Sequence, residues 1–391
     1  LSHDHLTRMG CAFCKQHRGK HLATPNGELA NYSWDKRKLE NPDDYCIGNK
    51  ICGVFVKVPG TIKGQMFRVR KCQNTFIYLL DNINTLFVDE CKNCSIITGP
   101  VQTSLFVRNC TNCKILASCQ QYRVRDCNSV TTFLACTSDP IIESSSELKF
   151  APYQFSYPEL KGQFAAAGLN VFNCMWSSVH DFSPNGDGSL NFSYLPHSEK
   201  VSDFFLLPQE AVEQHCVPTG DSDPDASSTA AVAVQDLVNL KISFDETCSI
   251  VPKTAGSLEL APIEDPMSVL VAVFHHPEVE DNAMALIRQI VKTGKAFLVR
   301  TRSAILRPED IRQIFGDVTH ASHAKLGPVI FLLFCGAEGE VCQLCTDSVR
   351  EVVRAKAIQP QTLLHVTDNP VAAKRQFQMF VCLCDAQQYH T

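Results

Sequence analysis

The chain has 391 residues, a formal net charge of −5 and 20 cysteines. This length allows two or three domains with buried cores, and the mild acidity excludes the strong positive charge of many nucleic-acid-binding proteins. The longest apolar run, 327–337, is too short to cross a bilayer. Because no apolar signal segment is visible, we expect a cytosolic chain whose cysteines are free thiols.

The first methionine is Met9, and it begins the stretch MGCAFCKQHRGK. We expect translation to start there, so that removal of Met9 exposes Gly10 for N-myristoylation and leaves Cys11 beside it for palmitoylation. The usual pattern has Ser or Thr where this chain has Cys14, which is a departure. Two acyl groups hold a protein stably on a membrane, and the basic residues that follow favour an anionic leaflet. We predict a leader and lipidated basic tail over 1–30; the alternative is an unmodified tail.

A repeat with a period near 20 residues occupies the first half of the chain. The segments FRVRKC, LFVDEC, LFVRNC and YRVRDC end at cysteines that are 19, 19 and 17 residues apart. Such a period indicates a solenoid, and units this short, rich in Val, Ile, Phe and Thr, favour strands joined by turns. We predict a parallel β-helix with one coil per repeat. Its expected inward residues are Val69, Val88, Val107 and Val124, followed by Cys72, Cys91, Cys110 and Cys127.

Two of the repeats contain a second cysteine, in CKNC (91–94) and CTNC (110–113). This spacing is typical of zinc ribbons, so a zinc site is the alternative interpretation. Both pairs fall at the same phase of the repeat, where the other two repeats have one cysteine. A column of small interior side chains explains all four repeats, whereas zinc explains two, so we expect no metal site.

The fourth repeat contains the segment CQQYRVRDC, 119–127. Gln121, Arg123 and Arg125 alternate with Tyr122 and Val124, and side chains alternate between the two faces of a strand. The three polar residues therefore share one exposed face. Taken alone, such a pattern is most simply a solvated strand face. The residues expected to point outward in all four repeats are Arg68, Arg70, Asp89, Arg108, Arg123 and Arg125, and the column of Arg123 also holds Phe87 and Phe106.

Several segments resemble the tubulin-binding-cofactor-C family. They are CQQYRVRDC, DPIIESSSELKF (139–150), YSWDKRK (32–38), PGTIKGQMF (59–67), GPVQTSLFVRNC (99–110), YPELKGQFAAAGLNVFN (157–173) and WSSVHDFSP (176–184). The resemblance covers most of residues 9–206 and implies a mainly β chain with a right-handed β-helix over 31–206. It also implies a GTPase-activating protein, tethered to the cytoplasmic face of the plasma membrane or the ciliary base and acting in ciliary protein trafficking.

The implied partner is an Arf-like small GTPase in its GTP-bound state. By resemblance, Arg123 matches the family's arginine finger and Gln121 the glutamine beside it. The positions that contact or orient the GTPase match Gln120, Arg125, Glu143 and Phe182. GTP and Mg²⁺ would arrive with the GTPase, so the chain would need no cofactor of its own and would not be an independent enzyme. The alternative is a non-catalytic effector or scaffold for the GTP-bound GTPase.

The amino-acid composition of the chain changes after the repeats. Residues 202–240 contain no Lys or Arg, and GDSDPDASS (220–228) is acidic and poor in apolar residues. Such composition is typical of loops and linkers, so we predict an acidic linker over 207–265.

The remaining residues, 266–391, alternate between strand and helix patterns. We predict strands over 267–274, 296–302 and 327–334 and helices over 281–294 and 307–318, which indicates an α/β sandwich.

This part resembles nucleoside diphosphate kinase, which implies a ferredoxin-like fold, and LLHVTDNPVAAKRQF (363–377) places His365 at the phosphate-accepting histidine. The first strand, however, leads into HHPEVED where the kinase has a phosphate-binding Lys. The stretch between Phe334 and His365 is also too short for the kinase's nucleotide-clamping loop. We therefore expect His365 to be vestigial and kinase activity to be absent.

Overall fold

The computed structural model describes residues 42–215, 234–316, 319–323 and 326–388. Residues 45–391 form one compact unit. The predicted acylation sites, Gly10 and Cys11, lie outside the described residues.

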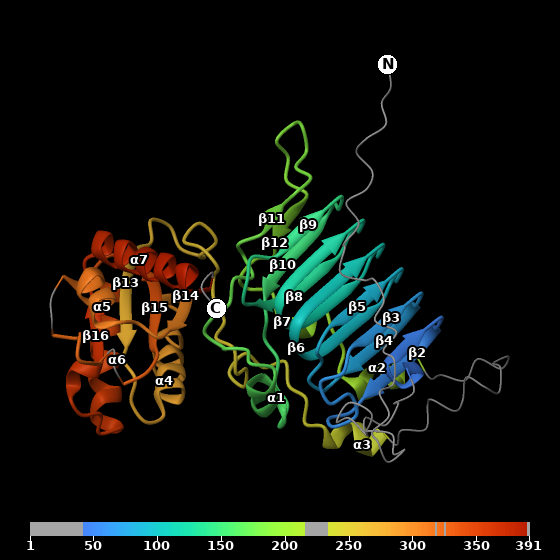
Figure 1. Cartoon of the computed structure of the whole chain (residues 1–391), viewed down its shortest axis with the longest axis horizontal. Helices are drawn as coiled ribbons and strands as arrows, with labels where there is room; N and C mark the ends of the chain where they lie inside the picture. The colour runs from blue at the N-terminus through green and yellow to red at the C-terminus, as the bar shows by residue number, and fades with distance from the viewer. Residues whose placement is uncertain (1–41, 216–233, 317–318, 324–325, 389–391) are drawn as a thin grey trace, which may run out of the picture. The chain divides into compact units, whose positions relative to one another are not determined.

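The first part of this unit is a β-helix of parallel strands (Figure 1). Its strands are β1 (Cys46–Gly48), β2 (Ile51–Lys57), β3 (Phe67–Arg70), β4 (Gln73–Leu79), β5 (Leu86–Asp89), β6 (Ser95–Arg108), β7 (Lys114–Arg125), β8 (Thr131–Cys136), β9 (Ile141–Glu143), β10 (Leu148–Pro152), β11 (His180–Asp181) and β12 (Phe192–Tyr194). Along one face β1, β3, β5, β6, β7, β9 and β11 pair in sequence; along the next, β2, β4, β6, β7, β8, β10 and β12 do. The predicted parallel β-helix is confirmed.

The interior of the β-helix consists of columns of like residues. Val69, Val88, Val107 and Val124 are in register from strand to strand and buried, as the repeat predicts. Burying each valine stabilises the fold by roughly 1.5–3 kcal/mol relative to leaving it exposed. This column fixes the register of the coils, because a slip by one residue would turn the valines outward.

The cysteines also stack in columns. Cys91 and Cys110 are buried in one column and Cys94 and Cys113 in the next, and the thiols of Cys94 and Cys113 donate to main-chain carbonyl oxygens of the preceding coil. Side-chain amides form a ladder on the outside of the same corner, with Asn112 donating to Asn93 and Asn93 to Asn74, both at 2.9 Å. Within the described residues, no group of three or more His, Cys, Asp or Glu side chains is arranged to hold a metal ion.

Helices and loops cover another face of the β-helix. They include α1 (Leu160–Ala166), α2 (Pro208–His215) and α3 (Val234–Asn239). The predicted linker, 207–265, contributes α2 and α3, and Leu237 and Val251 from it are buried. Residues 216–233 of that segment lie outside the described part of the chain.

The α/β region follows from residue 267. Its elements are β13 (Met267–Val273), α4 (Val279–Val291), β14 (Ala296–Ala304), α5 (Pro308–Phe315), β15 (Val329–Gly336), α6 (Glu340–Ala355), β16 (Leu364–Thr367) and α7 (Pro370–Gln388). The strands form an antiparallel sheet in the order β14-β15-β13-β16, with α4 against α6 and α5 against α7 (Figure 1). The predicted α/β fold is confirmed. Among the described helices, none has the length and apolar character needed to cross a bilayer.

Candidate partner-binding face

Arg123 lies on the exposed face of β7. Its strand neighbours Tyr122 and Val124 are buried, so the alternation of the strand directs Arg123 outward. Phe106 on β6 and Ile141 on β9 flank Arg123 in register. The column continues through Phe87 to Arg68, as the repeat predicts.

On this strand face, the side chain of Gln121 contacts both Arg123 and Ser104. Arg123 Nη2 donates to Gln121 Oε1 at 3.4 Å, and Ser104 Oγ on β6 donates to the same oxygen at 3.3 Å. In the part of the chain that the structure describes, no carboxylate forms an ion pair with Arg123. The guanidinium therefore keeps most of its five donors available for an incoming acceptor.

Arg108, one coil away, shows the opposite situation. Its Nε and Nη2 donate to the two carboxylate oxygens of Asp89 at 2.7 and 3.0 Å, and this bidentate pair raises the pKa of Arg108. Asp89 is the in-register neighbour of Arg108, whereas the in-register neighbours of Arg123 are apolar. The residue in register with each arginine thus decides whether its guanidinium forms an ion pair.

The next column contains two further predicted site residues. Arg125 is exposed and lies in register with Glu143 on β9. Arg125 Nε also forms a 3.1 Å ion pair with Asp126 Oδ2. Glu143 is exposed and brings negative charge to a face that is otherwise rich in arginine.

Gln120 and Phe182 lie at the margins of this face. The side chain of Gln120 is exposed, and its carbonyl oxygen accepts hydrogen bonds from the amide and hydroxyl of Ser138, both at 3.0 Å. Phe182 directly follows β11, is 63% exposed, and donates its main-chain N–H to Ile142 O at 2.9 Å. The ring of His180 contacts the Phe182 ring at a centroid distance of 4.6 Å.

The neighbouring strands β7 and β9 thus carry Gln120, Gln121, Arg123, Arg125 and Glu143, and Phe182 directly follows the next strand, β11. Ser104 was not predicted, although it precedes its repeat cysteine by the same interval as Gln121 does. Aligning the repeats at that position would have found it. The Phe87–Phe106 pair, stacked at 5.1 Å, was predicted as a column but not as a feature of the site.

His365 lies in the α/β region, on β16. It is in register with Ala272, and its ring contacts Phe315 and His320 at centroid distances of 5.1 and 4.7 Å. In the HHPEVED segment, His276 is buried and bonds to Phe274 O and the Asn282 amide at 2.7 and 3.0 Å. This histidine therefore has a packing role in the segment that follows β13.

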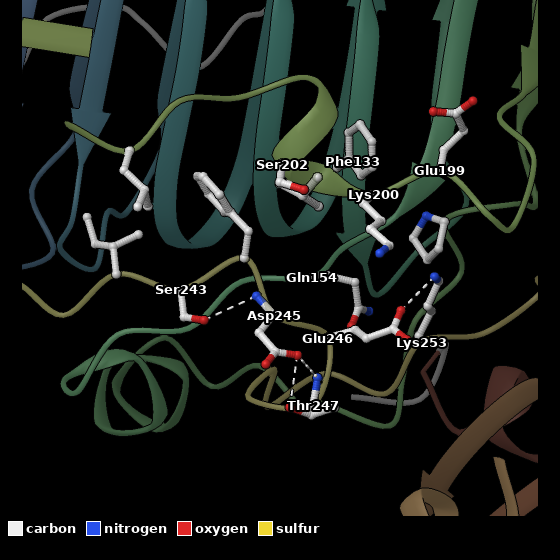
Figure 2. A pocket seen from close by; sticks show the side chains of 15 residues that line it. Phe133, Gln154, Glu199, Lys200, Ser202, Ser243, Asp245, Glu246, Thr247 and Lys253 are labelled. Carbon is white, nitrogen blue, oxygen red and sulfur yellow. Dashed lines mark hydrogen bonds and ion pairs between the residues drawn. The ribbon is translucent and has the colours of Figure 1, made fainter. Parts of the chain in front are cut away.

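A pocket of about 460 Å³ lies on the face of the β-helix that carries β8 and β10 (Figure 2). Phe133 and Pro152 line it from these strands, and 199–202 and 242–247 supply most of the remaining lining. Three of its charged side chains have partners within the pocket lining. Lys253 pairs with Glu246 at 2.7 Å, and hydrogen bonds from the Thr247 amide and hydroxyl lower the pKa of Asp245. The predicted site residues that the structure describes are not among those lining this pocket.

Comparison with known proteins agrees with the architecture. A family model described as "Tubulin binding cofactor C" matches residues 64–182. Protein XRP2 of Homo sapiens is 37% identical over 347 residues, covering 87% of this chain and 91% of that protein. Protein XRP2 of Gallus gallus is 33% identical over 97% of this chain and 99% of its own length. Tubulin-specific chaperone C of Homo sapiens is 36% identical over 129 residues, which are 32% of this chain and 37% of that protein.

Proposed function

We propose, because the chain belongs to the Protein XRP2 family, that it stimulates GTP hydrolysis by an Arf-like small GTPase and supplies Arg123 as an arginine finger. GTP and Mg²⁺ arrive with the GTPase, and the chain adds no cofactor of its own. In this role the protein activates its partner and is not an independent enzyme.

The chemistry requires positive charge that the GTPase alone lacks. Phosphoryl transfer spreads negative charge over the phosphate oxygens, and a planar guanidinium supplied in trans stabilises it through paired N–H donors. Such a finger is worth roughly 10³–10⁵ in rate. A strand within a β-helix is a rigid support, so the guanidinium is placed within a narrow range of positions.

The availability of the Arg123 guanidinium is the observation that carries this proposal. It is exposed, its column neighbours are apolar, and its one hydrogen bond within the described chain is the 3.4 Å contact with Gln121. Gln121, itself contacted by Ser104, orients the guanidinium or contacts the catalytic loop of the GTPase. Gln120, Arg125, Glu143 and Phe182 surround Arg123 and bind the partner surface.

The test separates binding from hydrolysis. Arg123→Ala should still bind the GTP-loaded GTPase but should lose stimulated single-turnover hydrolysis at saturating protein by about 10³-fold or more. The fold should be retained, because substitutions on an exposed surface usually change stability by no more than about 0.5 kcal/mol. Arg68→Ala is the matched control, since it removes an exposed arginine from the same column. If Arg123→Ala stimulated hydrolysis normally at saturation, the arginine-finger assignment would be wrong and the scaffold alternative would be favoured.

The proposed setting is the cytoplasmic face of the plasma membrane or the ciliary base, in ciliary protein trafficking. Acyl groups on Gly10 and Cys11 would hold the protein there, since two chains suffice for stable attachment.

A further inference from the structure

The first coil of the β-helix, residues 45–66, carries a net positive charge. It contains three lysines and no Asp or Glu, and the absence of acidic residues extends to residue 80. Lys50 and Lys63 are exposed, and Lys57 is half-buried. Within the described residues, none of the three lysines forms an ion pair with a carboxylate.

The same coil exposes large aliphatic side chains. Ile51 is 73% exposed, Val58 37% and Met66 45%. Single exposed apolar residues are normal on protein surfaces, but three on one coil beside unpaired lysines form a mixed basic and apolar surface. We call this the first-coil surface, and it consists of Lys50, Ile51, Lys57, Val58, Lys63 and Met66.

The first-coil surface lies at the end of the solenoid. β1 pairs with β3 and β2 with β4, and no other described strand pairs with β1 or β2. Figure 1 shows β2 at the end of the row of β-helix strands. Among the described strands, those of an inner coil have neighbours on both sides, whereas β1 and β2 have them on one side, so side chains of this coil can meet a surface from the end of the solenoid.

The loop that carries Lys63 and Met66 is fixed in position. The buried carboxylate of Asp81 accepts hydrogen bonds from the amides of Ile62 and Lys63 at 2.7 and 2.8 Å. The amide of Gly64 donates to Asn82 O at 2.9 Å. Little ordering entropy would therefore be lost when this loop meets a binding surface.

Several acidic side chains lie near the first coil, and the exposed Asp43 and Asp44 directly precede it in the chain. Glu210 on α2, the helix that packs against β2, accepts a hydrogen bond from the Leu207 amide at 2.7 Å. Glu213, also on α2, is exposed. Glu90 pairs with Lys71 at 3.8 Å. Lys50 is not neutralised by these groups; its Nζ lies 5.8 Å from the centre of the Phe55 ring.

From this arrangement we infer that the first-coil surface binds an anionic phospholipid surface. Lysines attract acidic headgroups, at about a fivefold gain in partitioning for each lysine near the membrane, and short aliphatic side chains enter the boundary below the headgroups. A single-stranded nucleic acid would instead require exposed aromatic rings among the lysines. The inference extends the proposed membrane attachment, but it concerns the folded domain and holds without acyl groups.

The experiment uses the full chain produced in bacteria, where it receives no acyl group. It should sediment with vesicles of phosphatidylcholine mixed with phosphatidylserine, and not with phosphatidylcholine alone. The double variant Lys50→Gln/Lys63→Gln should lower the partition coefficient by about 25-fold, or roughly fivefold for each lysine. Ile51→Ser should also weaken binding, and added salt should weaken it for the unaltered chain.

Lys292→Gln/Lys356→Gln is the matched control, because it removes two exposed lysines from the α/β region. Equal binding to both vesicle types, or an equal loss with the control variant, would overturn the inference. Stimulated GTP hydrolysis in solution should be unchanged in Lys50→Gln/Lys63→Gln, and vesicle binding should be unchanged in Arg123→Ala. Failure of the lipid contact is therefore distinguishable from failure of the proposed activator function.

Discussion

At the scale of single residues, the state of an arginine in this β-helix depends on its column neighbour. Arg108 is bound by Asp89 from the preceding coil, whereas Arg123 has Phe106 in the equivalent place. An arginine finger must reach a phosphate oxygen without first breaking a strong pair. The apolar neighbours of Arg123 are therefore part of the candidate site, even though they carry no chemistry themselves.

This relation can be tested by placing a carboxylate beside Arg123. Phe106→Asp should pair with Arg123 as Asp89 pairs with Arg108, and an exposed pair of this kind is worth about 0.2–1 kcal/mol. We expect stimulated single-turnover hydrolysis to slow by up to about fivefold at low salt and to recover partly as salt screens the pair. Phe106→Asn is the control, since it removes the same ring without adding charge. A slowing as large in Phe106→Asn as in Phe106→Asp would refute the explanation.

At the scale of elements, the sequence predicts the features that recur in each coil, but it does not predict those that occur only once. The valine and cysteine columns are confirmed because each coil places the same residue at the same phase. The bends of β6 are harder to foresee, since its register with β7 shifts between Ile97 and Pro100 and again between Val101 and Ser104. The packing of α2 and α3 is not predicted either, because the lack of Lys and Arg over 202–240 and the acidic stretch 220–228 indicate a linker. For the candidate site, strand alternation predicts that Arg123 is exposed, but only the fold places Phe182 nearby.

The bend in β6 depends on a close approach of two coils at Gly99. A Cβ atom there would lie 2.3 Å from Asp81 O and 2.9 Å from Tyr157 Oη. Gly99→Ala should therefore lower the free energy of unfolding by about 1–3 kcal/mol, as overpacked sites do. Gly162→Ala in α1 is the control, because a Cβ there meets nothing within 4 Å and should stabilise the helix by roughly 0.5–1 kcal/mol. Urea unfolding followed by circular dichroism measures both, and an unchanged midpoint for Gly99→Ala would contradict the close approach.

At the scale of the whole molecule, the proposed features follow one another along the chain. The predicted lipidated tail precedes the first coil in the sequence, and the column of Arg123 includes Arg68 in the next coil. Three steps between strands separate Arg68 from Arg123, a distance of about 14 Å along the solenoid at the usual strand spacing. If the first coil binds the lipid surface, the β-helix holds Arg123 at a fixed distance from the membrane.

Because the acylation sites and the first coil are separate segments, substitutions can test the contribution of each to membrane attachment. Expressed from Met9 in animal cells, the protein should fractionate with membranes, and Gly10→Ala should release most of it, because loss of the myristoyl group also leaves Cys11 without its partner anchor. Cys11→Ser should weaken attachment or redirect it. Lys50→Gln/Lys63→Gln with Gly10 intact should weaken it less than Gly10→Ala, since lipid chains supply most of the affinity. Fractionation followed by immunoblotting compares the variants. If Gly10→Ala left the membrane fraction unchanged, the acylated tail could not be the main anchor.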